Sequence, residues 1–343
     1  MATRDAEAPR RRSGVTESEV LGGFLGMAIG DALGMPLVGL SAAGISDRYG
    51  EVDGYLPWED EREVVAEAGE FTDETEVALC IVEALTTNRG AVDPDLIGAR
   101  MGYLAAGASR RWLSEETRRV LDAAGDRIDP LVPYDDDGPA TGDVASRGIP
   151  IGLMAAVGPF DEAWLRASAE TVTRLTHGSP AAIAATTAVA YAVSLAARRD
   201  VSPGQWAAAS AAFLGVGELA DRLGAGPAEM MSDSGTGTGG IATMSVPAAI
   251  HFASMAGSFE EAVFPAVRAG GASDTVGAIA GALAGARFGA GAIPQGLIDG
   301  LGGRIYVSLA APWYYKASLQ RAGMVISIRP EGENERPAMP PRR

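Results

Sequence analysis

Helical spacing of apolar residues dominates this chain of 343 residues, and the alternation typical of strands is scarce. Between Glu74 and Thr87, apolar side chains recur every three or four residues, as on one face of a helix. Thr16 and Glu19 form a capping-box pattern before an apolar stretch that runs toward Gly34. Further helices are expected at residues 95–106, 115–124, 161–171, 180–198, 202–223, 247–256, 259–268, 275–288 and 294–302. The pattern predicts an all-α fold, with residues 39–69 mostly in loops.

Small residues at close spacing indicate tight contact between helices. They recur at Gly277, Ala280, Gly281, Ala284 and Gly285, where the absence of bulky side chains allows close approach of a neighbouring helix. Neither an internal repeat nor a convincing linker divides the chain. We therefore expect one compact all-α domain over residues 16–328. Residues 1–15 are expected to form a disordered Arg-rich tail, and residues 329–343 a polar, Pro-rich tail.

Charge and cysteine content exclude several classes of function. The net charge of −16 argues against binding to nucleic acid or to anionic membranes, since both require a basic surface. A phosphorylated small ligand needs only local positive charge or backbone N–H groups. Because the chain has one cysteine and two histidines, a disulfide framework is impossible and a zinc site is not expected. We expect a cytoplasmic protein without a secretory signal, and the sequence leaves its oligomeric state open.

The Ala- and Thr-rich segment 180–197 is uncharged and long enough to raise the question of a membrane span. It begins with Ser179 and Pro180, a favourable pair for the start of a helix. We interpret it as a buried core helix.

Four loops concentrate Gly, Asp, Ser and Thr between the expected helices, at residues 26–34, 134–147, 231–243 and 270–275. A helical scaffold that gathers such residues at its helix ends suits an oxygen-rich or phosphorylated ligand. The glycines of residues 231–240 have two interpretations, a flexible loop or a phosphate cradle. The segment lacks the Gly-Lys-Ser/Thr ending of a P-loop.

Two acidic helix starts stand out, Thr72-Asp73-Glu74 and Ser273-Asp274-Thr275. Carboxylate and hydroxyl oxygens are the donors that Mg²⁺ and other hard cations prefer. Each start also has a purely structural interpretation, because acids in a first turn favour the helix dipole and Thr72 is a suitable N-cap. His177, in turn, would simply orient a turn before the helix that follows it.

Six segments in a fixed order resemble the ADP-ribosylglycohydrolase family, which includes the dinitrogenase reductase-activating glycohydrolases and the jellyfish J1-crystallins. They are residues 26–36, 71–76, 146–153, 175–180, the Gly-rich loop before 246–249, and 270–281. The resemblance spans roughly residues 19–288. It implies a compact all-α domain with its site in a central cleft among the helices, in agreement with the helical periodicity.

The resemblance also implies two Mg²⁺ or Mn²⁺ ions that hold the distal ribose of an ADP-ribosyl group. The ligands of one ion correspond here to Thr72, Asp73, Glu74 and Asp274, where Glu74 replaces the usual Asp. For the second ion, Asp274 and Thr275 are retained, whereas two family acids are replaced by Val38 and Ala272. We therefore expect one divalent ion, or none, and a vacant second position.

A further departure from the family pattern lies at residues 141–147. The family commonly has Asn-Gly followed by small residues and Met-Arg, whereas this chain has Gly142, Asp143 and Ser146. An acid gained at Asp143 while another is lost at Val38 suggests a relocated general acid or base. The alternative is that Asp143 only caps the next segment.

These observations predict an enzyme that acts on a glycosidic bond of an ADP-ribosyl or related ribosyl-nucleotide substrate, either a small molecule or an ADP-ribosylated group. The expected catalytic residues are Asp73, Asp143 and Asp274. Substrate binding is expected at Asp31, Gly34, Ser146, Arg147, His177, Gly235, Gly237, Gly239 and Gly271. Two alternatives stay open: an inactive relative that binds ADP-ribose or serves structurally, and a relative repurposed for another small-molecule reaction.

Overall fold

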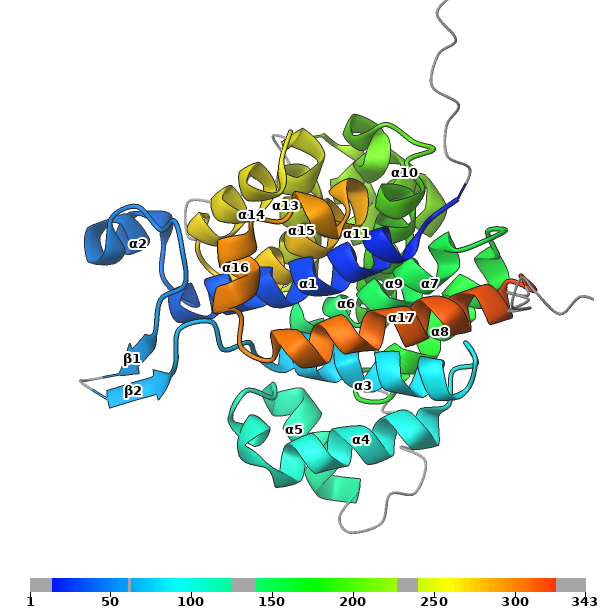
Figure 1. The fold of residues 1–343 in the computed structure, drawn as a ribbon, viewed down its shortest axis with the longest axis horizontal. Helices are drawn as coiled ribbons and strands as arrows, with labels where there is room; N and C mark the ends of the chain where they lie inside the picture. Colours follow the sequence, from blue (N-terminus) through cyan, green and yellow to red (C-terminus); the bar gives the residue numbers. More distant parts are fainter. Residues whose placement is uncertain (1–13, 61–62, 125–139, 227–239, 325–343) are drawn as a thin grey trace, which may run out of the picture.

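Two antiparallel helices in close contact, α1 (Glu17–Gly34) and α15 (Ser273–Phe288), lie at the centre of the computed structural model (Figure 1). Their contact is made by glycines that recur every four residues. A Cβ atom added at any of these positions of α1 would lie 1.9 to 2.2 Å from a backbone oxygen of α15. The pairs are Gly22 with Gly285, Gly26 with Gly281, Gly30 with Gly277, and Gly34 with Ser273. The small residues predicted from the α15 sequence therefore do form a close helix contact.

The structure describes residues 14–60, 63–124, 140–226 and 240–324. The helices around the central pair are α2 (Ala42–Tyr49), α3 (Asp73–Thr87), α4 (Pro94–Ala106), α5 (Glu115–Ala124), α6 (Asp143–Ser146), α7 (Gly148–Ala156), α8 (Glu162–Arg174), α9 (Pro180–Arg198), α10 (Trp206–Leu214), α11 (Glu218–Gly224), α13 (Ala242–Met255), α14 (Phe259–Arg268), α16 (Gln295–Gly300) and α17 (Arg304–Arg321). Short 3₁₀ turns are η1 (Met35–Leu37), η2 (Ala108–Arg111), η3 (Pro203–Gln205) and η5 (Ala290–Ala292). One antiparallel hairpin, β1 (Trp58–Asp60) with β2 (Glu63–Ala66), projects from this body (Figure 1).

The all-α prediction is confirmed, and several predicted helix ends match the structure. Thr16 caps α1, and its backbone N–H donates to Glu19 Oε2 at 2.8 Å, which completes the expected capping box. The Ser179 hydroxyl accepts from the Ala182 N–H at 3.2 Å, and α9 starts at Pro180. Local cap chemistry in the sequence was therefore sufficient to place these two starts.

Other predicted boundaries were wrong. The helix expected at 202–223 is divided into η3, α10 and α11, because Gly215 and Gly217 adopt positive φ angles of 89° and 144° between the helices. Helix α13 begins at Ala242 and carries Pro247 inside it, whereas the sequence pattern predicts a start at Pro247. Helices α2, α7 and α17 were not predicted, and α2 and the hairpin lie in the expected loop 39–69.

Two segments are long and apolar enough to cross a membrane by length and composition, Glu17–Leu37 and Pro180–Arg198. Within the fold they are 94% and 72% buried, respectively. Packing against other helices therefore accounts for their apolar character, as expected for core helices. Their burial agrees with the interpretation of residues 180–197 as a buried core helix.

Candidate active site

The N-terminal ends of α3, α6 and α15 meet at one place beside the end of α1. The Thr275 hydroxyl of α15 donates a hydrogen bond to Glu74 Oε1 of α3. A Cβ at Gly142, just before α6, would lie 3.2 Å from Thr275 Cγ2, so the starts of α6 and α15 are also in contact. Three helix dipoles thus direct their positive ends toward the same acidic cluster. The helix dipoles favour ionised carboxylates there, whereas burial and repulsion among the acids act in the opposite direction.

Asp31, near the end of α1, caps α3 from outside that helix. Its fully buried carboxylate accepts four hydrogen bonds, from the backbone N–H and the hydroxyl of both Thr72 and Thr75, at 2.6 to 3.1 Å. Thr72 occupies the N-cap position, but its side chain makes no capping bond to α3. Asp31 was predicted as a substrate-binding residue, and the structure places it beneath the site, where it fixes the start of α3.

Three carboxylates carry the candidate cation site: Asp73, Glu74 and Asp274. Burial raises the pKa of both Asp73 and Glu74 well above the usual range, and the neighbouring acids raise both further. The pKa of Asp274 is raised to about 6, mainly by burial and also by Asp143. Each charge destabilises the others, so a nearby cation would stabilise the ionised cluster.

Asp143 differs from the other acids in its protonation. Burial raises its pKa, but His177, Arg147 and hydrogen bonds from the Thr141 and Ser114 side chains outweigh burial and hold the pKa below its usual value. Asp143 is half-buried at the first position of α6, and no side chain caps that helix. The structure therefore disagrees with the alternative interpretation of Asp143 as a helix cap.

Arg147 and Ser146 lie behind the carboxylates. The Arg147 guanidinium is 2% exposed and donates to Val172 O at 3.2 Å, Thr176 Oγ1 at 2.6 Å and Thr117 Oγ1 at 3.2 Å. Burial lowers its pKa, while nearby Asp143 and the other acids raise it. The Ser146 hydroxyl donates to the Asp143 carbonyl at 2.7 Å within α6. Arg147, predicted as a substrate-binding residue, thus supplies buried positive charge to the cluster from behind.

His177 connects to this cluster through threonine hydroxyls. Its Nδ1 lies 2.8 Å from Thr176 Oγ1, and its Nε2 lies 3.1 Å from Thr141 Oγ1. Sequence reasoning named His177 but missed Ser114, Thr141 and Thr176. These short polar residues carry no motif of their own, and only the fold brings them next to the acids.

The predicted glycine contacts divide into three groups. Gly34 packs against the backbone of Ser273, where an added Cβ would lie 2.1 Å from its carbonyl oxygen, so its role is close helix contact. Gly271 is half-buried with a φ of 75°, beside the start of α15. Gly235, Gly237 and Gly239 lie outside the described residues. The residue that follows them, Gly240, accepts a hydrogen bond from Gly142 N at 2.8 Å, next to Asp143.

The donors present fit one divalent cation of the Mg²⁺ type. Glu74 Oε2 is buried without a hydrogen-bond partner, and an unpaired carboxylate oxygen is costly unless a cation or water satisfies it. Across the described parts of the chain, no three His, Cys, Asp or Glu side chains are gathered closely enough to hold a metal by themselves. The Thr72 and Thr275 hydroxyls, or water, would have to complete the ligand set, which is normal for Mg²⁺.

The residues at the second family metal position do not fit a cation. The Val38 side chain is 49% exposed, and the Ala272 side chain ends in a methyl group. Their segments lie side by side, since Gly39 N donates to Gly271 O and Gly271 N donates to Leu40 O, each at 2.8 Å. Val38 and Ala272 therefore lie on two neighbouring segments beside the start of α15.

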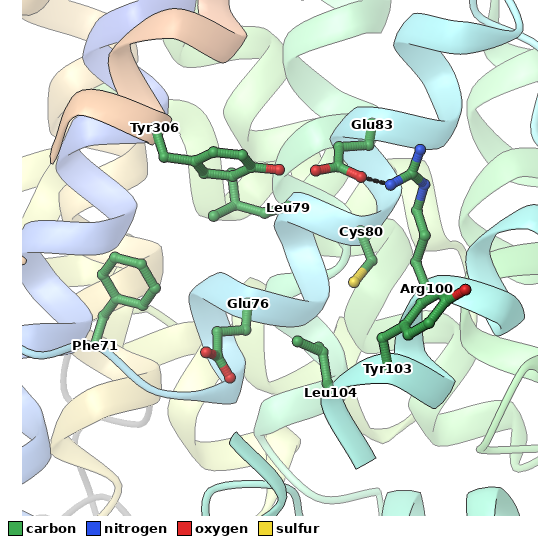
Figure 2. Close-up of a pocket in the computed structure, with 9 residues that line it drawn as sticks. All are labelled: Phe71, Glu76, Leu79, Cys80, Glu83, Arg100, Tyr103, Leu104 and Tyr306. Atoms are coloured by element: carbon green, nitrogen blue, oxygen red, sulfur yellow. Dashed lines mark ion pairs between the residues drawn. The ribbon is translucent and has the colours of Figure 1, made fainter. Parts of the chain in front are cut away.

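A separate cavity of about 300 Å³ lies between α3, α4 and the start of α17 (Figure 2). Its walls are mostly apolar, and the Glu83 carboxylate in it is paired with Arg100. Burial raises the pKa of the Cys80 thiol to about 12, so this cysteine is protonated and unsuited to nucleophilic attack. The acidic cluster is the better candidate for chemistry.

Comparisons with known proteins agree with this arrangement. A family model described as ADP-ribosylglycohydrolase matches residues 12–323. An uncharacterized protein from Archaeoglobus fulgidus is 30% identical over 87% of this chain and 96% of its own length. The ADP-ribosyl-[dinitrogen reductase] glycohydrolase of Rhodospirillum rubrum is 26% identical over 82% of this chain and 89% of its own. A solved ADP-ribosylglycohydrolase-related protein complex superposes with a TM-score of 0.70 at 29% identity, covering 88% of this chain and 98% of that one.

Proposed function

Because the chain belongs to the ADP-ribosylglycohydrolase family, we propose that it is a divergent hydrolase that cleaves the glycosidic bond of an ADP-ribosyl or related ribosyl-nucleotide substrate. One observation carries the proposal. Acids from α1, α3, α6 and α15 interact with one another, and Arg147 is the one arginine among the described residues that is buried beside them, near Asp143, Asp73 and Glu74, so negative charge exceeds positive charge at the cluster. Such an excess suits a divalent cation and a reaction in which positive charge builds at carbon.

A Mg²⁺ or Mn²⁺ ion would be held by Thr72, Asp73, Glu74, Asp274 and Thr275. When bound, it would orient the ribose hydroxyls and offset the repulsion among the acids. The protein supplies a rigid frame for these ligands, because Asp31 fixes the start of α3 through four hydrogen bonds. The replacements at Val38 and Ala272 argue for one ion.

Asp143 is the proposed base. A water molecule attacks the anomeric carbon as the glycosidic bond breaks, and the bonding electron pair leaves with the aglycone. The water gives one proton to the Asp143 carboxylate, and its remaining hydroxyl group becomes bonded to the anomeric carbon. Asp143 then passes that proton through solvent to the departing aglycone, which leaves as a neutral group and regenerates the carboxylate. A carboxylate held ionised at neutral pH suits the first proton transfer.

A second candidate function is supported by the alkyl side chains at Val38 and Ala272. An inactive relative would keep the acidic cluster for binding ADP-ribose and lack the oxygens that the family uses for its second ion. A relative repurposed for another small molecule fits the same replacements together with Asp143.

The test is hydrolysis of ADP-ribosyl-arginine and ADP-ribosyl-serine with and without Mg²⁺. Replacing Asp73, Asp143 or Asp274 by Asn should lower turnover by about 10² to 10⁴. The matched control is Asp122→Asn on the surface of α5, whose carboxylate pairs with Arg110 and should leave turnover unchanged. Full activity of the three Asn variants would refute the assignment. Thermal stabilisation by ADP-ribose without turnover of either substrate would favour the binding protein.

A further inference from the structure

The cavity between α3, α4 and the start of α17 is a second place where a ligand could bind (Figure 2). Cavities that bind small molecules have volumes of about 300–1,000 Å³, and this one, at about 300 Å³, suits a ligand with a single ring or a short chain. The charges that act on Glu76 in its wall are those of Glu70 and Arg111, and not those of the acids in the candidate active site. The cavity is therefore electrostatically separate from the acidic cluster, although α3 contributes to both.

Three aromatic side chains line this cavity, those of Phe71, Tyr103 and Tyr306. In the view of Figure 2, Phe71 and Tyr306 stand toward one end of the cavity and Tyr103 toward the other. Tyr103 is 77% exposed and Tyr306 is 46% exposed, so much of their ring surface is available to a ligand that enters from solvent. The face of an aromatic ring carries partial negative charge and attracts a cation placed over it.

The carboxylates of the cavity wall are only partly neutralised. Glu83 is paired with Arg100. Glu76 instead accepts one hydrogen bond, from the Ser109 hydroxyl to its Oε1 at 2.6 Å, and its buried Oε2 has no hydrogen-bond partner. Within the described part of the chain, the wall thus carries one carboxylate that is not paired with a cation.

Arg111, the arginine whose charge acts on Glu76, is engaged with other groups. Its guanidinium pairs with Glu70 and donates to Val65 O at 3.0 Å. Burial raises the pKa of Glu76, and a further positive charge nearby would favour its ionised form. Because the attraction between charges acts through space, a cation in the cavity need not touch Oε2 to stabilise this carboxylate.

We propose that this cavity binds a small organic cation, a protonated amine carried on an aromatic or short aliphatic body. The body packs against Leu79 and Leu104, and the ammonium group lies among the aromatic rings on the side of Glu76. An anionic ligand is repelled by Glu76, and a neutral ligand leaves the charge of Glu76 unbalanced. This site goes beyond the proposed function and does not depend on it, since none of the acids of the candidate active site lines the cavity.

Three probes with the same phenyl ring and two-carbon chain separate the effect of charge from that of shape. At neutral pH, phenethylamine is a cation, phenethyl alcohol is neutral and phenylacetate is an anion. Ligand-observed NMR titrations of the full chain measure their dissociation constants, with Mg²⁺ added because the acidic cluster would otherwise attract the amine.

We expect the amine to bind about 3- to 30-fold more tightly than the alcohol, because attraction to the rings and to Glu76 adds to burial of the phenyl group. Phenylacetate should bind more weakly than the alcohol. Equal affinities of the amine and the alcohol, tightest binding by phenylacetate, or no binding of the amine would each overturn the proposal.

Glu76→Gln tests the charge, because glutamine keeps the shape of the side chain and an oxygen that accepts from Ser109. This variant should weaken binding of the amine about 3- to 10-fold and leave binding of the alcohol unchanged. The matched control is Glu162→Gln on the surface of α8, whose carboxylate pairs with Arg166 away from the cavity. Unchanged amine binding in Glu76→Gln would place the amine elsewhere on the protein and contradict the proposal.

Two further variants test the location. Cys80→Met puts a larger side chain into the cavity wall and should weaken binding of both the amine and the alcohol. Tyr306→Leu removes a ring from the exposed start of α17 and should weaken binding of the amine more than that of the alcohol. Circular dichroism establishes that each variant is folded, and the exposed position of Tyr306 keeps the test available if Cys80→Met does not fold. Unchanged binding of the amine in a folded variant of either kind would refute this site.

Discussion

The contact between α1 and α15 predicts that Gly26→Ala destabilises the fold, against the usual effect of alanine in a helix. An ideal Cβ at Gly26 would lie 2.0 Å from the Gly281 carbonyl oxygen and 3.1 Å from a ring carbon of Phe259. The obstructing oxygen belongs to a helix backbone, so no rotamer change can remove the clash. Helices α1 and α15 would have to move apart by about 1 Å.

The magnitude follows from two opposing effects. Alanine gains about 0.5–1 kcal/mol over glycine in a helix interior, because less backbone entropy is lost on folding. Overpacking a close contact costs about 1–3 kcal/mol, and a gap of about 1 Å also forfeits up to half of each dispersion contact along the interface. We therefore expect a net loss of about 2 kcal/mol in the free energy of unfolding.

Denaturation in urea, followed by far-ultraviolet circular dichroism, measures this difference. The matched control is Gly102→Ala in α4, where no heavy atom lies within 4 Å of the added Cβ. Propensity alone acts at Gly102, so that variant should gain about 0.5–1 kcal/mol. The two substitutions should thus have opposite signs. A Gly26→Ala protein as stable as the unmodified protein would refute the close contact.

Three further predictions concern buried titratable groups. Burial raises the pKa of Asp31 to about 7 in the folded state, so the stability from this group is present at pH 4 and is lost as the pH rises through about 7. Urea denaturation without divalent ions should show that the free energy of unfolding falls over that pH range. Asp31→Asn should make the free energy of unfolding less dependent on pH. Added Mg²⁺ should raise the melting temperature more at pH 7.5 than at pH 5. Arg147→Met should cost about 3–5 kcal/mol, measured by urea denaturation, because it leaves buried acids without their cation. Iodoacetamide at pH 8 should label Cys80 only in denaturant, because the buried thiol has a pKa of about 12. Mass spectrometry measures the extent of labelling, and rapid labelling of the folded chain would contradict this burial.

The amino-acid sequence by itself determined the fold class and several helix starts. Apolar spacing and cap residues act over three or four positions, so Thr16 and Ser179 placed the starts of α1 and α9 from local chemistry alone. The ordered motifs also indicated the family correctly. The same local signals failed for α17, where Pro312 interrupts a helix that packing nevertheless maintains.

Tertiary structure decided what each polar residue does. Asp31 and Thr75 are distant in sequence, and the close approach of α1 to its neighbours turns a supposed ligand contact into a cap for α3. Arg147 reads as an anion-binding residue in the sequence, but burial directs its guanidinium toward Thr176 and away from solvent. The protonation of Asp143 likewise depends on Arg147 at the end of α6 and on Ser114, Thr141 and His177 in the loops before α5, α6 and α9. Residue types set the available chemistry, whereas burial and hydrogen-bond partners set the charge that each group carries.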